Sequence, residues 1–285
     1  MFLKKALAFM LLFAAAVNSF AVTPVASREY KLMLEPSNFN GTNPATAVSA
    51  FWNALQQVIA SGIGRSTSGT FALDKSRTVR FYDTPGTCLL SNNKLIFRER
   101  VESGNREVTL KYRSFDRFVS SYQDMSGIGG DAETKFEEDL GAPYSVKYSH
   151  STTQGISDSK NLNRMDDPIG LYPGLESYNF DDTLPIAVVG GLTVAERVYK
   201  GPSVDLGSEN GAFSLTLWYA GGDLTAPLVA EISFKYKDAA EDYSENVVTR
   251  AQNLFLDMQT MTAWLAADAV SKTAFIYGYD PSFCR

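Results

Sequence analysis

Short segments in which charged and apolar residues alternate recur along this chain, and they restrict the folds that it can adopt. Residues Lys94–Glu102 read KLIFRERVE, and residues Glu107–Ser114 read EVTLKYRS. Because successive side chains of a strand point to opposite faces, each segment predicts a strand with one charged and one apolar face. The pattern favours a β-rich fold over a helical bundle.

Other segments share this strand character, and two longer ones have a helical period. The expected strands are Ser27–Leu34, Ser76–Tyr82, Lys94–Glu102, Glu107–Ser114, Glu133–Leu140, Leu192–Lys200, Ala212–Ala220, Pro227–Lys237 and Lys272–Tyr279. The turn Ser103-Gly104-Asn105 predicts a hairpin between the third and fourth of them. Thr46–Ile63 and Tyr243–Ala267 carry apolar residues at spacings of three and four, which predicts two helices with one buried face.

These elements predict an α+β fold, a mostly antiparallel β-barrel with a tunnel-like interior and the helices packed outside. One domain spanning residues 22–285 is expected. The stretch 141–185 is rich in polar residues, glycine and proline and has little periodicity. It is therefore interpreted as a surface insertion or a lid.

Residues 1–21 have the pattern of an export signal. Lys4 and Lys5 precede the apolar run Ala6–Val17, and Ser19-Phe20-Ala21 is a small-residue cleavage pattern. The run is short for a membrane span, although an uncleaved anchor is the alternative interpretation. We therefore expect a periplasmic or secreted protein with no membrane anchor after cleavage.

Charge and metal-ligating residues exclude several classes of function. The net charge is −6, and losing Lys4 and Lys5 leaves 24 basic against 32 acidic residues, or −8. This balance argues against nucleic acid as a partner. With one histidine and two cysteines, any metal must be held by carboxylates. Cys88 and Cys284 either form a disulfide or remain as two thiols, and the sequence makes no prediction of oligomeric state.

The charged strand faces have two interpretations. Alternating charge ordinarily marks the solvated face of an antiparallel sheet. In a barrel covered outside by apolar helix faces, however, the same charges would line the lumen. Guanidinium groups there would clamp phosphate oxygens, and carboxylates would hold a hard divalent cation. The local charge would explain how an acidic protein binds a small phosphorylated anion.

Four motifs in chain order resemble those of the CYTH or triphosphate tunnel metalloenzyme family. Residues 27–31 (SREYK) are similar to the family's E-x-E-x-K strand, with its first Glu replaced. Residues 81–85 (FYDTP) and 95–100 (LIFRER) resemble its Y-F-D-T-P and L-R-x-R motifs. Residues 107–111 (EVTLK) look like its T-L-K strand, and residues 135–139 (KFEED) resemble R-x-E-x-E.

The C-terminal half resembles the family less closely. Ala195-Glu196-Arg197 matches a K-x-R strand without its lysine, and Ala230–Ser233 (AEIS) matches E-x-E with the second Glu replaced. The family's strand aspartate has no equivalent within Leu215–Ala220. Lys272 resembles a lysine that follows the family's C-terminal helix. Compared with the family motifs, this sequence has therefore lost more of the acidic residues than of the basic ones.

The resemblance implies roles for particular residues. The phosphate-binding set is Lys31, Arg98, Arg100, Lys111, Arg197 and Lys272. The metal-binding set, for Mg²⁺ or Mn²⁺, is Glu29, Glu137, Asp139 and Glu231. Glu29 and Glu231 would also be catalytic, by orienting a water through the metal.

Three functions are compatible with the sequence. The chain could bind triphosphate, polyphosphate or a related anion and have weak metal-dependent triphosphatase activity. It could instead be an exported binding protein of the same fold without turnover. A barrel with an apolar ligand and solvent-facing charges is the third possibility. The direction of Arg98, Arg100 and Lys111 separates the third from the first two.

Overall fold

A computed structural model describes residues 22–285, so the expected signal at residues 1–21 lies outside the described part of the chain. Its strands form one sheet. They are β1 (Ser27–Leu34), β2 (Thr67–Ser68), β3 (Ala72–Asp83), β4 (Leu95–Glu102), β5 (Asn105–Ser114), β6 (Glu133–Gly141), β7 (Ser145–Ile156), β8 (Ala187–Val188), β9 (Val194–Asp205), β10 (Asn210–Ala220) and β11 (Val229–Lys237).

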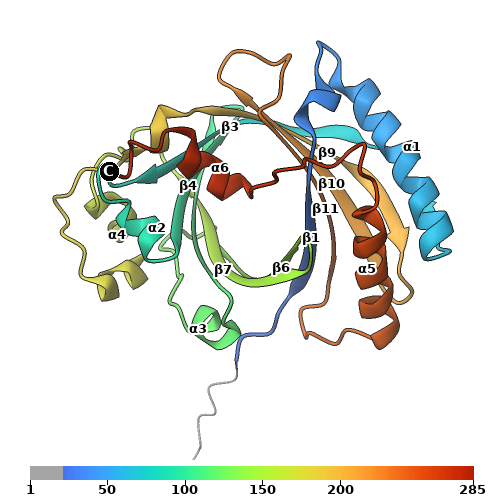
Figure 1. Ribbon diagram of the computed structural model, residues 1–285. Helices are drawn as coiled ribbons and strands as arrows, with labels where there is room; N and C mark the ends of the chain where they lie inside the picture. The colour runs from blue at the N-terminus through green and yellow to red at the C-terminus, as the bar shows by residue number, and fades with distance from the viewer. Residues whose placement is uncertain (1–21) are drawn as a thin grey trace, which may run out of the picture.

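The sheet closes into a barrel (Figure 1). Its strands follow the order β9-β10-β11-β1-β6-β7-β5-β4-β3, and β3 pairs again with β9. The short strands β2 and β8 extend it beside β9 and β3. β1 and β6 are parallel, whereas the other strand pairs are antiparallel. The expected α+β barrel is therefore confirmed.

The helices lie around the barrel and at one of its ends. They are α1 (Pro44–Gly62), α2 (Leu89–Asn92), α3 (Arg117–Ser121), α4 (Asp166–Leu171), α5 (Glu245–Met258) and α6 (Lys272–Tyr279), with the short 3₁₀ helices η1 (Pro36–Phe39), η2 (Pro173–Tyr178) and η3 (Val189–Gly191). No helix in residues 22–285 is long and apolar enough to cross a membrane.

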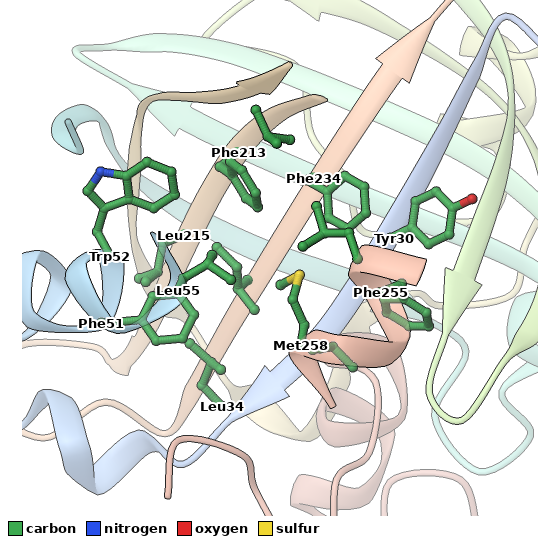
Figure 2. Close-up of a cluster of buried hydrophobic side chains, with 14 of the residues drawn as sticks. Tyr30, Leu34, Phe51, Trp52, Leu55, Phe213, Leu215, Phe234, Phe255 and Met258 are labelled. Atoms are coloured by element: carbon green, nitrogen blue, oxygen red, sulfur yellow. The ribbon is translucent and has the colours of Figure 1, made fainter. Parts of the chain in front are cut away.

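The largest apolar core lies outside the barrel, between its wall and the two long helices (Figure 2). Tyr30 on β1 stacks on Phe234 of β11 and contacts Phe255 of α5. Trp52 of α1 packs against Phe213 of β10. The apolar faces of β1, β10 and β11 thus point outward, which leaves their polar faces for the lumen.

A second core covers the opposite wall. The outward side chains Phe97, Leu110 and Tyr112 are buried under α4, η2 and the loops around them. Tyr172 lies in this layer, and its hydroxyl donates to the carbonyl of Val108 at 2.8 Å. Both apolar walls are therefore covered by chain segments outside the barrel.

Three expectations about the elements were wrong. The polar stretch 141–185 contains the barrel strand β7, whose outward face mixes Val146, Tyr148 and Ile156 with polar residues, so no clear alternation of apolar and polar residues marks it. Residues 272–279 form helix α6, because the Ser271 side chain caps its first turn by accepting from the amide of Ala274. The second long helix ends at Met258, after which the chain turns and Trp264 packs on Phe51. The hairpin of β4 and β5 is confirmed.

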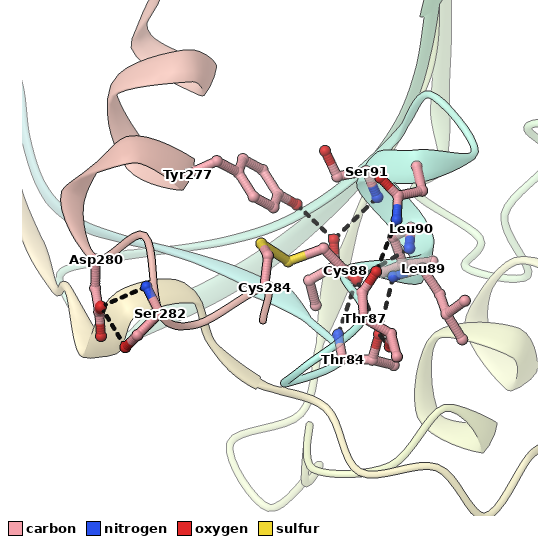
Figure 3. The surroundings of a disulfide bond; sticks show 12 residues. Thr84, Thr87, Cys88, Leu89, Leu90, Ser91, Tyr277, Asp280, Ser282 and Cys284 are labelled. Atoms are coloured by element: carbon pink, nitrogen blue, oxygen red, sulfur yellow. Dashed lines mark hydrogen bonds between the residues drawn. A yellow bond between two sulfur atoms is a disulfide. The ribbon is translucent and has the colours of Figure 1, made fainter.

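The C-terminal segment is tied to the barrel wall beside α6 (Figure 3). Cys88 and Cys284 form a disulfide, which resolves the two alternatives. Close by, the Tyr277 hydroxyl donates to Asp83 Oδ2 at 2.8 Å. The amide of Gly86 also donates to the carbonyl of Phe283 at 2.7 Å. These links fix α6 across one opening of the barrel (Figure 1).

Candidate functional site

The strand register determines which side chains face the lumen. Arg98 is paired with Phe81 and Thr109, whereas its neighbour Phe97 belongs to the outer core. The same alternation around the barrel places many charged side chains inside. They are Glu29, Lys31, Arg77, Arg98, Arg100, Glu107, Lys111, Arg113, Lys135, Glu137, Asp139, Glu196, Glu231 and Lys235.

The lumen is hollow rather than packed. The side chains of Glu29, Lys31 and Lys111 keep 19%, 24% and 17% of their surface exposed although strands surround them. Near the turn between β4 and β5 the lumen meets a cavity of about 770 Å³, whose lining includes Arg77 and Arg100. A small polar ligand can therefore reach the charged side chains from this mouth.

The opposite end of the lumen is apolar. Phe81, Trp218 and Val229 point inward there, and Ile276 of α6 packs against their cluster with 1% of its surface exposed. Lys272, the first residue of α6, lies where the apolar and charged parts meet. Its Nζ is 2.7 Å from Glu231 Oε1 and 5.4 Å from the centre of the Trp218 ring. Helix α6 thus bounds the charged part of the lumen at this end, and this part is called the charged chamber below.

On one wall, a carboxylate is surrounded by cations. Asp139 Oδ1 is 2.6 Å from Lys31 Nζ, and Oδ2 accepts from Arg113 at 2.8 Å and Ser149 at 2.6 Å. Burial alone would raise the pKa of Asp139, but Lys31 and Arg113 outweigh it and hold the pKa well below its usual range. Burial and Lys31 oppose each other in the same way at Glu29, whose pKa falls to about 2. These acids are ionised and already paired.

On the facing strand β4, two arginines are less fully paired. Arg98 forms no ion pair or hydrogen bond with any part of residues 22–285, and its Nε is buried. The Arg100 Nε is likewise buried without a partner, and its Nη1 is 3.5 Å from Glu107. Burial lowers the pKa of Arg98, and the charge of Arg100 lowers it further. The charges of Glu196 and Glu107 oppose this lowering, but neither carboxylate forms an ion pair with Arg98 in residues 22–285.

Glu196 separates these arginines from the apolar end. It is 3% exposed and accepts from Trp218 Nε1 at 2.7 Å and from Arg77. Burial would raise the pKa of Glu196, yet Arg100 and Lys272 lower it to about 2. Arg77 and Lys272 are therefore each close to a carboxylate, whereas Arg98 forms no ion pair within residues 22–285.

Lys111 lies between the two walls. Its Nζ is 4.0 Å from Asp139 Oδ2, farther than Lys31 or Arg113. Burial lowers the pKa of Lys111 to about 8, with Arg113 and Lys31 adding to the effect and Asp139 opposing it. An anion beside this ammonium would favour its charged form.

Five of the six expected phosphate-binding residues face the lumen: Lys31, Arg98, Arg100, Lys111 and Lys272. The expectation for Arg197 was wrong. Its guanidinium lies 5.7 Å from the ring centre of Tyr219, in the core outside the barrel. The adjacent Glu196 faces inward, so strand alternation forces Arg197 outward. The convergence of the inner cations excludes the interpretation in which the charges face bulk solvent.

The expected metal-binding residues all face the lumen, but they do not form one centre. Glu231 is paired with Met33, four residues along β1 from Glu29, or about 13 Å. Glu231 is bound by Lys272, and Asp139 by Lys31 and Arg113. Within residues 22–285 no group of three or more potential ligands could hold a metal ion. The four carboxylates therefore do not form one shared Mg²⁺ or Mn²⁺ site within residues 22–285, and metal binding stays a prediction.

The lumen also contains four residues for which the sequence predicts no site role: Arg77, Arg113, Ser149 and Glu196. Arg113 follows Lys111 by two residues, so alternation could have identified it. Ser149 belongs to β7, whose sequence shows no clear apolar face, so strand alternation could not have identified Ser149 as a lumen residue. Glu196 could have been found only by knowing which face of β9 is covered.

No family model matches the sequence, and no curated protein matches it either. Three solved structures have similar folds. A candidate adenylyl cyclase from Hippeastrum, described as having a dominant triphosphatase activity, is 14% identical, with a TM-score of 0.45 over 90% of this chain and 97% of that one. Candidate adenylate cyclases from Bacillus halodurans and Vibrio parahaemolyticus are 11% and 12% identical, with TM-scores of 0.42 and 0.35. They cover 88% and 89% of this chain and 97% and 98% of theirs. The ligand of this lumen has to be inferred from its own residues.

Proposed function

We propose that the lumen binds a small phosphorylated anion, such as tripolyphosphate or the end of a short polyphosphate. The observation that carries this proposal is Arg98, an enclosed guanidinium that contacts the Phe81 ring but forms no ion pair or hydrogen bond in residues 22–285. A buried charge of this kind is costly unless a ligand pairs with it. Arg100, two residues along the same strand, lines the cavity at the mouth.

The neighbouring cations favour a ligand with several charges. Arg98 and Arg100 are two residues apart on β4, and Lys111 is on the adjacent β5. The planar fork of a guanidinium matches two oxygens of one phosphate, whereas an ammonium acts as a point charge. A chain of phosphates would engage both arginines and Lys111 at once. The resemblance of the strand motifs supports the same class of ligand.

The paired carboxylates favour binding over turnover. Hydrolysis of a phosphoanhydride needs a positioned water and neutralisation of developing charge. The arginines supply charge, but Glu29, Asp139 and Glu231 are each bound by a lysine or an arginine of the protein. We therefore place an exported binding protein ahead of an efficient phosphohydrolase. Weak Mg²⁺- or Mn²⁺-dependent triphosphatase activity stays a prediction, measured as phosphate release with and without EDTA.

Calorimetric titration with tripolyphosphate tests the proposal. Arg98→Ala is expected to weaken binding at least about tenfold, since charge-assisted hydrogen bonds contribute about 1.5–3 kcal/mol each. Arg197→Ala is the matched control, because it removes an arginine from the outer face of the same barrel. Titrations with sulfate and citrate show whether phosphate is preferred. Absence of binding by the wild type, or equal losses in both variants, would refute the proposal.

We also propose that the protein works in an oxidising compartment outside the cytoplasm, periplasmic or secreted. The Cys88–Cys284 disulfide supports this location, because such bonds persist mainly in oxidising environments. Fractionation of cells that produce the full chain is the test. Recovery of an uncleaved protein in the cytosol would contradict it.

A further inference from the structure

We propose that the Cys88–Cys284 disulfide is a positioning device for the anion site, so that the lumen reaches full affinity only in the oxidised protein. The bond holds α6, and with it Lys272, against the end of the charged chamber. This inference rests on the proposed function, because it concerns the regulation of the same site. It makes the redox state of the compartment a determinant of ligand binding.

The disulfide is well placed to hold α6. It joins positions separated by 196 residues, and Cys284 lies shortly after the end of α6 (Figure 3). Cys88 follows β3, a strand of the lumen wall. The bond therefore links the C-terminal segment directly to the wall that carries the apolar end of the lumen.

Apart from the disulfide, α6 and the residues after it are held by a few polar contacts and by packing, with Phe275, Tyr277 and Phe283 partly buried against the cluster that contains Ile276. The helix has eight residues, and Ile276 alone among them is fully buried. Its noncovalent links to the wall include the Tyr277 hydroxyl bond to Asp83 and the backbone bond between Gly86 and Phe283. An isolated helix of this length is not stable in water. Loss of the covalent link should therefore let α6 separate more often from the barrel.

Movement of α6 would change the charge of the chamber in two ways. Lys272 would leave the lumen, which removes a cation. Glu231, whose partner at 2.7 Å is Lys272, would then face the lumen unpaired. Lys272 also contributes to keeping Glu196 ionised and neutralised. Both changes disfavour an anion, so a small displacement of one helix weakens binding at a site built mainly by other strands.

The chemical step is a thiol–disulfide exchange with a dithiol reductant. The S–S bond breaks, the two sulfurs of Cys88 and Cys284 become thiols, and the reductant becomes a disulfide. Two electrons and two protons pass from the reductant to the protein. Reoxidation reverses the step, so the effect on affinity should also reverse.

The test compares tripolyphosphate affinity in four proteins, each oxidised and after treatment with dithiothreitol. Reduction of the wild type is expected to weaken binding about fivefold and to speed amide exchange in residues 266–285, with recovery on reoxidation. Lys111→Ala should bind weakly yet keep the same fold-change on reduction. Lys272→Ala should bind weakly and lose that dependence. The double variant Cys88→Ser/Cys284→Ser should match the reduced wild type under both conditions.

The outcomes separate this inference from the proposed function. If the oxidised wild type does not bind tripolyphosphate, the proposed function fails. If it binds with the same affinity before and after complete reduction, the role of the disulfide fails while the proposed function stands. An undiminished redox effect in Lys272→Ala would also overturn the inference. Should the double variant not fold, reduction of the folded wild type decides the question.

Discussion

The two walls of the lumen use the same residue types with opposite results. Around Asp139, on β1, β5, β6 and β7, Lys31 and Arg113 lie within hydrogen-bonding distance of a carboxylate. On β4, Arg98 has no such partner in residues 22–285, and the Arg100 Nε has none either. The carboxylate of the first wall is fully paired with cations of the protein, whereas the arginines of the second would gain their missing partners by binding the proposed anion. A ligand site is thus indicated by charges that lack partners, more than by the number of charges.

Two lysines show the same contrast on a smaller scale. Lys31 is held by Asp139 and Glu29, and these carboxylates overcome the effect of burial and raise its pKa. Lys111 is 4.0 Å from Asp139, and burial lowers its pKa to about 8. The number and distance of the neighbouring carboxylates therefore decide whether burial lowers the pKa of a lumen lysine.

The largest expected effect is on stability, in the variant Asp139→Asn. Removing this charge leaves Lys31 and Arg113 enclosed without their main partner, and breaking a buried ion pair costs about 3–5 kcal/mol. We expect the free energy of unfolding in denaturant to fall by about 3 kcal/mol. Glu138→Gln, on the outer face of the same strand, should have a smaller effect. Equal stability of Asp139→Asn and the wild type would mean that the pairing of this carboxylate does not stabilise the protein.

The next prediction concerns Arg98→Met, which tests the other wall. The variant removes an unpaired charge, so the free energy of unfolding should rise by about 1 kcal/mol without ligand. Tripolyphosphate affinity should fall at least about tenfold, or about 1.4 kcal/mol. Thermal unfolding with and without ligand measures both. A loss of stability in the free protein would show that Arg98 has a partner in solution.

A smaller effect is expected from pH. Because the pKa of Lys111 is about 8, its ammonium loses its proton as pH rises through that value, and anion affinity should fall. Between pH 7 and 9 we expect a decrease of about threefold, with proton uptake on binding at the higher pH. Lys111→Arg should remove this dependence, since a guanidinium stays charged. The same pH profile in both proteins would assign the titration to another group.

The smallest expected effect is that of metal removal on binding. Because the lumen carboxylates are paired with cations of the protein, EDTA should change tripolyphosphate affinity by less than about twofold. Any phosphate release that depends on Mg²⁺ or Mn²⁺ should be slow and should disappear in Glu231→Gln. Robust turnover in EDTA would contradict this assignment. Vigorous metal-dependent turnover by Glu231→Gln would show that other carboxylates carry catalysis.

The barrel and most of its inner cations could be predicted because the alternation of charged and apolar residues along each strand is visible in the local sequence. Arg98 and Arg100 alternate with Phe97, so burying that aromatic side chain in the outer core turns both arginines inward. Strand β7 was not predicted, because it borders a polar lumen and also forms polar contacts on the outer side of the barrel. Helix α6 was predicted as a strand because its aromatic residues favour strands. Its N-terminal cap and its tertiary contacts stabilise the helix instead.

The pairing of charges could not be predicted, because it depends on which strands become neighbours. The parallel contact of β1 with β6 brings Glu29 beside Asp139 across 110 residues of sequence, and Lys31 binds both carboxylates there. Similarly, nothing local indicates that Glu196 rather than Arg197 faces inward. Residue types are local information, whereas the partner of each residue is a property of the closed barrel.

The pairing of β1 with β11 has a consequence for the order of folding. Ser27 is paired with Lys237, so the first barrel strand cannot find its antiparallel neighbour until almost the whole chain has been made. Contacts so distant in sequence give high contact order and slow folding, in the range of milliseconds to seconds or longer. Until then both edges of the sheet stay open to aggregation. A chain delivered in full before it closes, as translocated proteins are, would meet this requirement.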